Sequence, residues 1–301
     1  MFGAVSRPAA STSTLSGQLF KIVLGGLYVG AFVLILGLLA AGASFYLTPL
    51  AERAHHPGYW HWKSGGHIGR PLGITGAGMM SLLLLYSLRK RLRSFQKLGP
   101  LNRWLDVHIF LGIVGPSFVV LHSSFKAGGL VALSFWSMVA VAASGILGRF
   151  LYLQIPRTGS GEEIALAELE ATDRALSNRL SREFRLSDRL QKRLDQISAP
   201  AVGRLWSTLV EILVGDLVLS RRLGEFTRMC PGVPRSLLSE FERVLREKAH
   251  LRRKILLRSH VQAVFHYWHV VHKPFAVVMY LFMVVHIGVA LVTGYGGLGP
   301  P

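Results

Sequence analysis

The chain has 301 residues, half of them hydrophobic, and a mean hydropathy of +0.39. These totals are unusual for a soluble protein, and several uncharged runs reach the roughly 18–20 residues needed to cross a bilayer. A formal charge of +18 is also common in nucleic-acid-binding proteins, but here the basic residues gather at the ends of apolar runs, where they set membrane topology. We therefore expect an integral membrane protein that contacts lipid and no nucleic acid.

The chain contains a single cysteine, Cys230, which excludes an internal disulfide. The C-x-x-C-H sequence that attaches haem covalently is absent, and one cysteine cannot form an iron–sulfur cluster or a zinc–thiolate site. If haem binds, it is therefore held without a covalent bond, and histidine is the expected ligand.

Five apolar runs are long enough to cross a membrane as helices. They lie at about residues 19–47, 71–88, 105–125, 130–152 and 269–293. The predicted fold is all-α, an integral membrane bundle of five transmembrane helices. We divide the chain into a flexible N-terminal tail (1–18), transmembrane helices one to four (19–156), a helical insert (157–262), transmembrane helix five (263–295) and a C-terminal tail (296–301).

The insert, residues 157–262, contains no apolar run of membrane length and holds fourteen of the sixteen acidic residues. Leucines recur at helical intervals between residues 166 and 194. Pro200, Gly203 and the CPGVP sequence at 230–234 divide the segment into about three helices. We expect a water-facing helical insert between transmembrane helices four and five.

The basic residues predict the orientation of the chain. The loop at 89–103 holds six Lys or Arg and no acid, and the insert lies on the same side after two further crossings. The loops at 48–70 and 123–130 are poor in basic residues. The positive-inside rule then places the N-terminus, the 89–103 loop and the insert in the cytoplasm and the C-terminus outside. A bacterial inner membrane fits this arrangement.

Two of the apolar runs carry a pair of histidines at the same spacing. His108 and His122 are fourteen residues apart in VHIFLGIVGPSFVVLH, and His272 and His286 are fourteen apart in HKPFAVVMYLFMVVH. On a helix, fourteen residues span about 21 Å and return to within about 40° of the same face. Ionisable residues are costly inside a bilayer and usually have a task. Because these helices are predicted to run in the same direction, the histidines fall at two matched depths.

This arrangement suits two haem groups, because each haem iron takes one axial imidazole from each of two facing helices. A single histidine in a membrane helix is more often a packing residue, but two pairs at one spacing favour ligation. His266 and His269 are competing donors at the inner end of the fifth run. His272 is better aligned with His286, so we interpret the other two as membrane-edge residues.

Other residues are candidates for contacts with the same cofactors. Gly112 and Gly115 lie between the paired histidines and leave room for a ring against the backbone. Arg149, at the end of the fourth run, is a candidate partner for a haem propionate.

A group of histidines stands among tyrosine and tryptophan in the predicted outer loop at 48–70. One interpretation is an interfacial belt, because these aromatic residues favour the headgroup region. The alternative is a quinol site or a site for a further cofactor, for which His67 and His61 are the candidates.

The pattern in VHIFLGIVGPSFVVLH and HKPFAVVMYLFMVVH resembles the ferric reductase-like transmembrane family, which includes the membrane part of NADPH oxidases. In that family the third and fifth helices each carry two haem-ligating histidines at about this spacing. The resemblance covers about residues 70–155 and 265–293. It implies haem ligation by His108, His122, His272 and His286.

The chain is also similar to the cytochrome b subunit of quinol–cytochrome c reductases, which uses four histidines in the same geometric way on a different pair of helices. Two departures from these families matter. The chain shows no C-terminal flavin or nicotinamide domain, and the insert at 157–262 is longer than either family leads us to expect. NADPH oxidation by this chain is therefore not expected.

The sequence thus predicts a b-type membrane cytochrome with two haem b groups that passes electrons across the bilayer. It would act as a subunit of a respiratory or other oxidoreductase complex, with cytoplasmic or membrane redox subunits as partners. Whether the chain is itself an enzyme stays open. Two alternatives remain: a quinol-oxidising or quinone-reducing subunit that uses the outer histidines, and a haem-free membrane anchor or metal permease.

Overall fold

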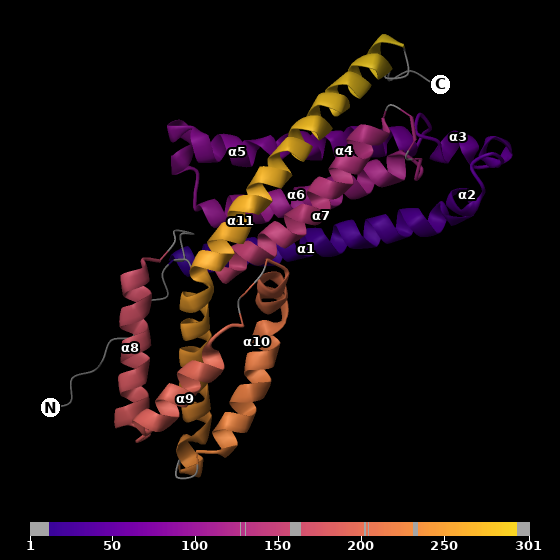
Figure 1. Ribbon diagram of the computed structural model, residues 1–301. Coiled ribbons are helices and arrows are strands. Elements are labelled where there is room, and N and C mark those ends of the chain that lie inside the picture. The colour runs from indigo at the N-terminus through magenta and orange to yellow at the C-terminus, as the bar shows by residue number, and fades with distance from the viewer. Residues whose placement is uncertain are drawn as a thin grey trace. The chain divides into compact units, whose positions relative to one another are not determined.

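The computed structural model describes residues 12–126, 128–129, 131–156, 164–201, 203, 205–230 and 234–293. All regular secondary structure in these ranges is helical (Figure 1). The chain divides into two compact units. The first unit comprises Met1–Ala142 and Phe275–Pro301, and the second comprises Ala143–Pro274. Both boundaries fall inside long helices, so the second unit joins the insert to parts of two predicted spans.

The element order begins with helices that alternate with short connections. They are α1 (Thr12–Ala41), α2 (Ala43–Leu47), η1 (Arg53–His55), α3 (Tyr59–Trp62), α4 (Gly69–Leu82), α5 (Leu84–Arg91), η2 (Arg93–Lys97), α6 (Leu101–His122) and α7 (Ala132–Gln154). The remaining elements are α8 (Leu166–Arg182), α9 (Asp188–Ser198), α10 (Leu205–Arg228), η3 (Arg235–Leu237) and α11 (Leu238–Val292).

Within the described part of the chain, five helical segments are long and apolar enough to cross a membrane. They are Leu15–Ala41, Gly69–Arg91, Leu101–His122, Ala132–Gln154 and a stretch of Leu238–Val292. The prediction of an all-α fold with five candidate membrane spans is therefore confirmed, and these spans indicate an integral membrane protein.

Two predicted boundaries differ from the structure. Helix α1 begins at Thr12, so residues 12–18 are helical rather than part of a tail; extending a helix that has already formed is cheap. Residues 1–11 and the predicted tail at 296–301 lie outside the described residues. Helix α11 is a single helix of 55 residues, because no glycine or proline stands between Leu238 and Lys273. The insert and the fifth span are therefore continuous, with Pro274 inside the helix.

In the first unit, α4 packs directly against α6 through glycines. A Cβ atom added at Gly76 would lie 2.8 Å from Cγ2 of Val119 and 2.9 Å from the carbonyl oxygen of Gly115. The two backbones therefore approach closely, as small residues allow between membrane helices. Beside this contact, Leu72, Val114, Phe118 and Leu121 form a buried cluster to which α1 adds partly buried side chains.

Arg53 organises the loops at one end of the first unit. Its side chain is buried and donates three hydrogen bonds to backbone carbonyls: Nε to Thr48 at 2.8 Å, Nη1 to Ser124 at 2.6 Å and Nη2 to Tyr46 at 2.6 Å. Ser124 has a positive φ of 51°, and its hydroxyl donates to the carbonyl of Trp62 at 2.8 Å. Arg53 therefore satisfies carbonyls at the end of α2 and just beyond α6, and ties the end of α6 to the loop that begins at Thr48.

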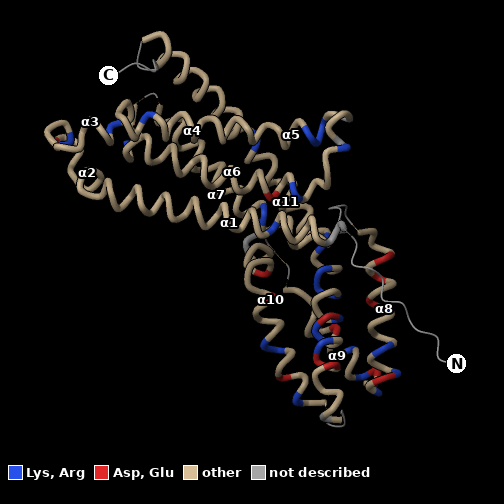
Figure 2. The backbone as a smooth tube through the Cα atoms, turned by 180° about the vertical axis from the view of Figure 1, so that it is seen from behind, with Lys and Arg blue, Asp and Glu red and all other residues tan. Residues whose placement is uncertain are grey.

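The second unit contains a helical bundle rich in charge. Figure 2 shows acidic residues gathered on α8, α9 and α10 and on the neighbouring part of α11, whereas most of the first unit carries few charges. The core of the bundle is formed by leucine, phenylalanine and valine side chains from these four helices. Some charges are buried with their partners: Nζ of Lys248 lies 2.8 Å from Asp173 and 3.2 Å from Asp195, and its side chain is 3% exposed.

Replacement of Gly76 by alanine is expected to force α4 away from α6, because the added methyl group meets backbone and Val119 atoms that cannot both move aside. We expect a loss of about 1–3 kcal/mol in stability, seen as a lower thermal midpoint of the purified protein. Gly78→Ala on the same helix is the matched control, since a Cβ atom there meets nothing within 4 Å. Equal midpoints for the two variants would show that this contact is unimportant.

A second prediction concerns Asp216, which lies 2.9 Å from Nε of Arg253 and 3.6 Å from Nδ1 of His250. Hydrogen bonding by His250, followed by the Arg253 contact, lowers the pKa of the Asp216 carboxyl from its usual 3.8 to about 2. A depressed carboxyl pKa contributes stability that is complete above about pH 4 and is lost as the pH falls toward 2.

Acid unfolding followed by circular dichroism tests this contribution. Between pH 4 and 2, Asp216→Asn is expected to lose stability less steeply than the original protein, because asparagine does not titrate. Glu170→Gln, a change at an exposed acid on α8, should leave the slope as it was. A slope unchanged in Asp216→Asn would contradict the assignment.

Candidate functional site

The structure brings together two of the four predicted ligands, His122 and His286. His122 is the last residue of α6 and His286 lies on α11, and both belong to the first unit. Their ring centroids are 6.4 Å apart and the rings are inclined by 64°. Two imidazoles on opposite sides of one metal ion, each with its nitrogen about 2 Å from the metal, have centroids roughly 6 Å apart. The separation therefore matches a pair of axial ligands.

The ring of His122 is held in place by α4. Its Nδ1 atom lies 2.8 Å from the carbonyl oxygen of Gly69. A carbonyl oxygen only accepts, so Nδ1 carries the proton in this bond and Nε2 carries the lone pair of the neutral ring. Metal-binding histidines are commonly fixed by such a bond from their second nitrogen.

A glycine makes room for the same ring. A Cβ atom added at Gly73, one turn beyond Gly69 on α4, would lie 2.5 Å from Nδ1 of His122 and 2.7 Å from its Cε1. No side chain larger than hydrogen fits there while the ring keeps its position. The imidazole therefore rests directly on the α4 backbone.

His108 repeats this arrangement at the other end of α6. Its Nδ1 atom lies 3.3 Å from the carbonyl oxygen of Leu83, the residue between α4 and α5. Gly69 and Leu83 are fourteen residues apart, as are His108 and His122. The α4–α5 segment runs antiparallel to α6 and thus offers each of the two α6 histidines a carbonyl acceptor at the same spacing. The His108 ring also lies 5.0 Å from the ring of Tyr86, beside a small apolar pocket lined by Val107 and Leu111.

His272 lies in the second unit and contacts α7. Its Nδ1 atom is 2.7 Å from Oγ of Ser144, and its ring centroid is 4.7 Å from that of Trp268. Trp268 donates from Nε1 to the Ser144 carbonyl at 2.7 Å and packs on Gly148, where a Cβ atom would be 2.3 Å from its ring. Ser144 thus orients both aromatic rings.

The predicted pairing of His108 with His272 joins residues of different units and stays a prediction. Of the competing donors, His269 lies 2.9 Å from the carbonyl oxygen of Phe265 on its own helix, and His266 is exposed. Neither position gives a reason to prefer it over His272.

Three further residues, Gly112, Gly115 and Arg149, were predicted to contact the cofactors. Gly115 packs on α4 near Met79, Met80 and Gly76, and a Cβ atom added at Gly112 would lie 3.8 Å from Cδ2 of Leu83, in ordinary contact distance of that side chain. The guanidinium of Arg149 lies 5.8 Å from the centroid of the Tyr152 ring. Contacts of these three residues with a cofactor stay predictions.

The candidate pair in the loop at 48–70 is brought together by tight backbone turns. The ring centroids of His61 and His67 are 5.6 Å apart, and both side chains are exposed. The amide of His67 donates to the carbonyl of Trp60 at 3.2 Å, and Gly66 sits so close that a Cβ atom would lie 2.4 Å from the same oxygen. Glycine is required there for the loop to fold back on α3.

No family model, curated protein or solved structure matches the chain. The chemistry of the site must therefore be inferred from its own residues. Among the residues that the structure describes, no group of three or more His, Cys, Asp or Glu could hold a metal ion. Haem iron needs only two protein ligands, because the porphyrin supplies the other four, and the His122–His286 pair fits this requirement.

Several residues of the site were not predicted from the sequence. Gly73, Gly148, Ser144 and Trp268 orient the histidine rings or leave room for aromatic side chains, but each is a common residue in membrane helices. Gly69 and Leu83 act through their backbone oxygens, which leave no trace in the sequence. A helical projection of α4 with Gly69, Gly73 and Gly76 on one face was the one available signal.

Proposed function

We propose that this protein is a b-type membrane cytochrome whose two haem groups are held by His108, His122, His272 and His286. The observation that carries the proposal is the separation of 6.4 Å between the His122 and His286 rings. It is supported by the two α6 histidines, each of which meets a backbone carbonyl of the α4–α5 segment at the same spacing of fourteen residues. The resemblance to ferric reductase-like and cytochrome b proteins described above supports it as well.

The residues of the chain hold and orient the cofactors. Nδ1 of each α6 histidine donates to a backbone oxygen, which presents Nε2 as the ligand nitrogen. When bound, haem supplies an iron that gains and loses one electron without a proton. Between His108 and His122, the buried cluster of Met80, Leu83 and Met138, joined by Met279 of α11, excludes water. Such a dry interior suits electron passage.

The same proposal includes the orientation of the chain in the membrane and its place in a redox complex. The six basic residues at 89–103 favour a cytoplasmic position for that loop and for the insert, with the C-terminus outside. A bacterial inner membrane and a cytoplasmic redox subunit docked on the insert fit this topology. The chain would then be the electron-transfer subunit of an oxidoreductase complex whose substrate chemistry lies with its partners.

The test is the number of haem groups per chain, measured as the pyridine haemochrome of the purified membrane protein. We expect two for the original protein and about one for His122→Ala and for His286→Ala, since each variant removes one axial ligand. Gly73→Ala keeps all four imidazoles but displaces the His122 ring, so the same haem should be partly lost.

Matched controls are His266→Ala, an exposed histidine on the same helix as His286, and Gly78→Ala on the same helix as Gly73. Both should retain two haems. A protein with no haem band would favour the haem-free anchor or permease. Two haems in His122→Ala would refute the assigned ligand pair.

The second candidate function is a quinol-oxidising or quinone-reducing subunit, and the observation in its favour is the juxtaposition of His61 and His67. Two exposed imidazoles at 5.6 Å could accept the protons that quinol oxidation releases. A quinone-analogue inhibitor should then shift the haem spectrum in the original protein and in His55→Ala, a change at another exposed loop histidine. The shift should be lost in His61→Ala and His67→Ala; a spectrum indifferent to the inhibitor would argue against this function.

A further inference from the structure

Helix α10 of the insert exposes a continuous apolar face. Val210, Leu213, Val214, Leu217 and Val218, here called the α10 stripe, are between 38% and 59% exposed. Their spacing of three and four residues places them on one side of the helix over about 12 Å. Among the described residues of α8 and α9, by contrast, Leu166 is the one large apolar side chain that is exposed to this degree.

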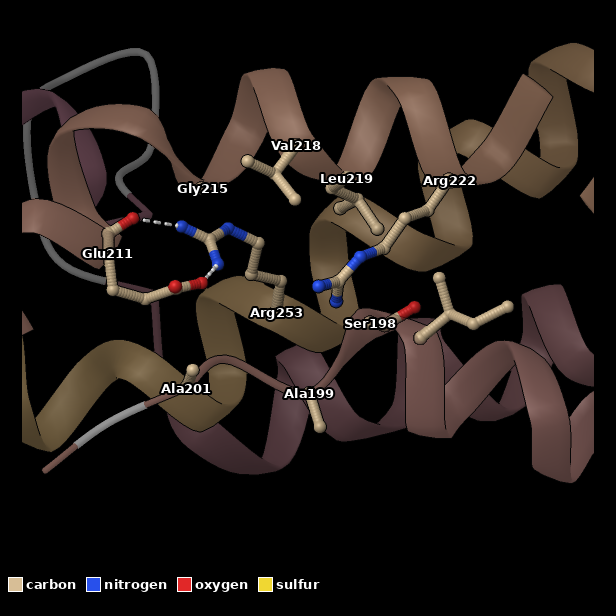
Figure 3. Close-up of a pocket in the computed structure, with 10 residues that line it drawn as sticks. Ser198, Ala199, Ala201, Glu211, Gly215, Val218, Leu219, Arg222 and Arg253 are labelled. Carbon is tan, nitrogen blue, oxygen red and sulfur yellow. Dashed lines mark hydrogen bonds and ion pairs between the residues drawn. The ribbon is translucent and has the colours of Figure 1, made fainter. Parts of the chain in front are cut away.

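The two acids of this part of α10 are both paired with one arginine. Between Leu205 and Ser220 the charged residues are Glu211 and Asp216, and both form ion pairs with Arg253 of α11. The Arg253 side chain is only 4% exposed. Figure 3 shows it extended below α10, with its guanidinium bonded to the carboxylate and the backbone oxygen of Glu211.

Gly215 permits this arrangement. A Cβ atom there would lie 2.1 Å from Nη2 of Arg253, so only glycine lets the guanidinium lie against the helix. One arginine thus compensates both carboxylates of this part of α10. From Val210 to Val218 the helix therefore carries no carboxylate without an ion pair to Arg253.

The inner side of the same helix packs on a candidate membrane span. Ile212 is buried in a cluster with Leu151 of α7, Ile155 just beyond α7 and Val261 of α11, and Leu209 packs against it. All these residues belong to the second unit. Leu151 lies in the last turn of the span Ala132–Gln154. The α10 stripe therefore begins beside the end of a helix that is itself apolar enough to be surrounded by lipid.

We propose that the α10 stripe is embedded in the membrane interface, with its aliphatic side chains among lipid acyl chains on the side where α7 ends. The helix satisfies its own backbone hydrogen bonds, and its acids are compensated internally, so contact with lipid costs little. Arg221 follows the stripe by one turn, where a long basic side chain reaches lipid phosphates. The composition of the insert predicted that it faces water throughout. On this proposal, one face of α10 contacts lipid instead.

Lipid is favoured over a protein partner by the continuity of the stripe with a span. A protein-binding face of an insert helix would be expected to carry a polar rim, and no charged side chain interrupts this face until Arg221. A second copy of the chain or a soluble subunit on the stripe would each give a distinct result in the test below.

The test places a fluorescent label at single cysteines of the full-length protein in lipid nanodiscs. Cys230→Ser removes the only native cysteine. Labels at Leu213→Cys and Leu217→Cys are compared with a lipid reference, Val277→Cys, at a 67% exposed position on the last span. Lys192→Cys, at an exposed position on α9, is the aqueous reference. Quenching by spin-labelled lipid and by iodide is measured for each.

We expect the two stripe labels to be quenched by spin-labelled lipid severalfold more than the label at position 192, and to resist iodide as the label at position 277 does. Quenching like that at position 192 would show that the stripe faces water and would overturn the proposal. Labels shielded from both quenchers would show a covering protein, and label-to-label energy transfer would identify it as a second copy. Either result would also overturn it.

Discussion

An imidazole placed inside an apolar helix bundle has to find an acceptor for its N–H group, because an unpaired polar hydrogen is costly away from water. In this molecule α6 meets that demand twice in the same way. His122 and His108 point Nδ1 at the backbone oxygens of Gly69 and Leu83, at equal spacing on the antiparallel partner. This pairing decides which nitrogen of each ring is left for other chemistry. It also requires the close approach of α4 and α6 that the glycines between them allow.

Much of the architecture could be predicted from the sequence, because a membrane span can be recognised from the length of an apolar run and from the charges at its ends. The five candidate spans, and the ends of α9 at Ser198 and of α10 at Arg228, follow from apolar runs and from proline and glycine. The spacing of the histidines singled out α6 and α11. Periodicity could not show that α11 continues from the insert into the last span, because the composition changes near residue 262 although no helix-breaking residue stands there.

The local environment of the histidines was beyond such reasoning. Acceptors such as the Gly69 carbonyl belong to the backbone, which every residue carries, so no pattern of side chains reveals them. The role of Gly73 depends on the register of α4 against α6, and register is a tertiary property. The same holds for Arg253, whose position beneath Gly215 compensates Glu211 and Asp216. Read without its partner, α10 looks like an ordinary charged helix of a soluble domain, because composition counts charges without regard to the face on which they lie.

The bond between His122 and Gly69 has a consequence for how the protein is made. His286 follows His122 by 164 residues, so a ribosome working at about 5–20 residues per second needs roughly 10–30 s to reach it. The α4 backbone, by contrast, has already been synthesised when α6 emerges. The His122 imidazole can thus be oriented by α4 before His286 is synthesised. The pair is completed when α11 is added.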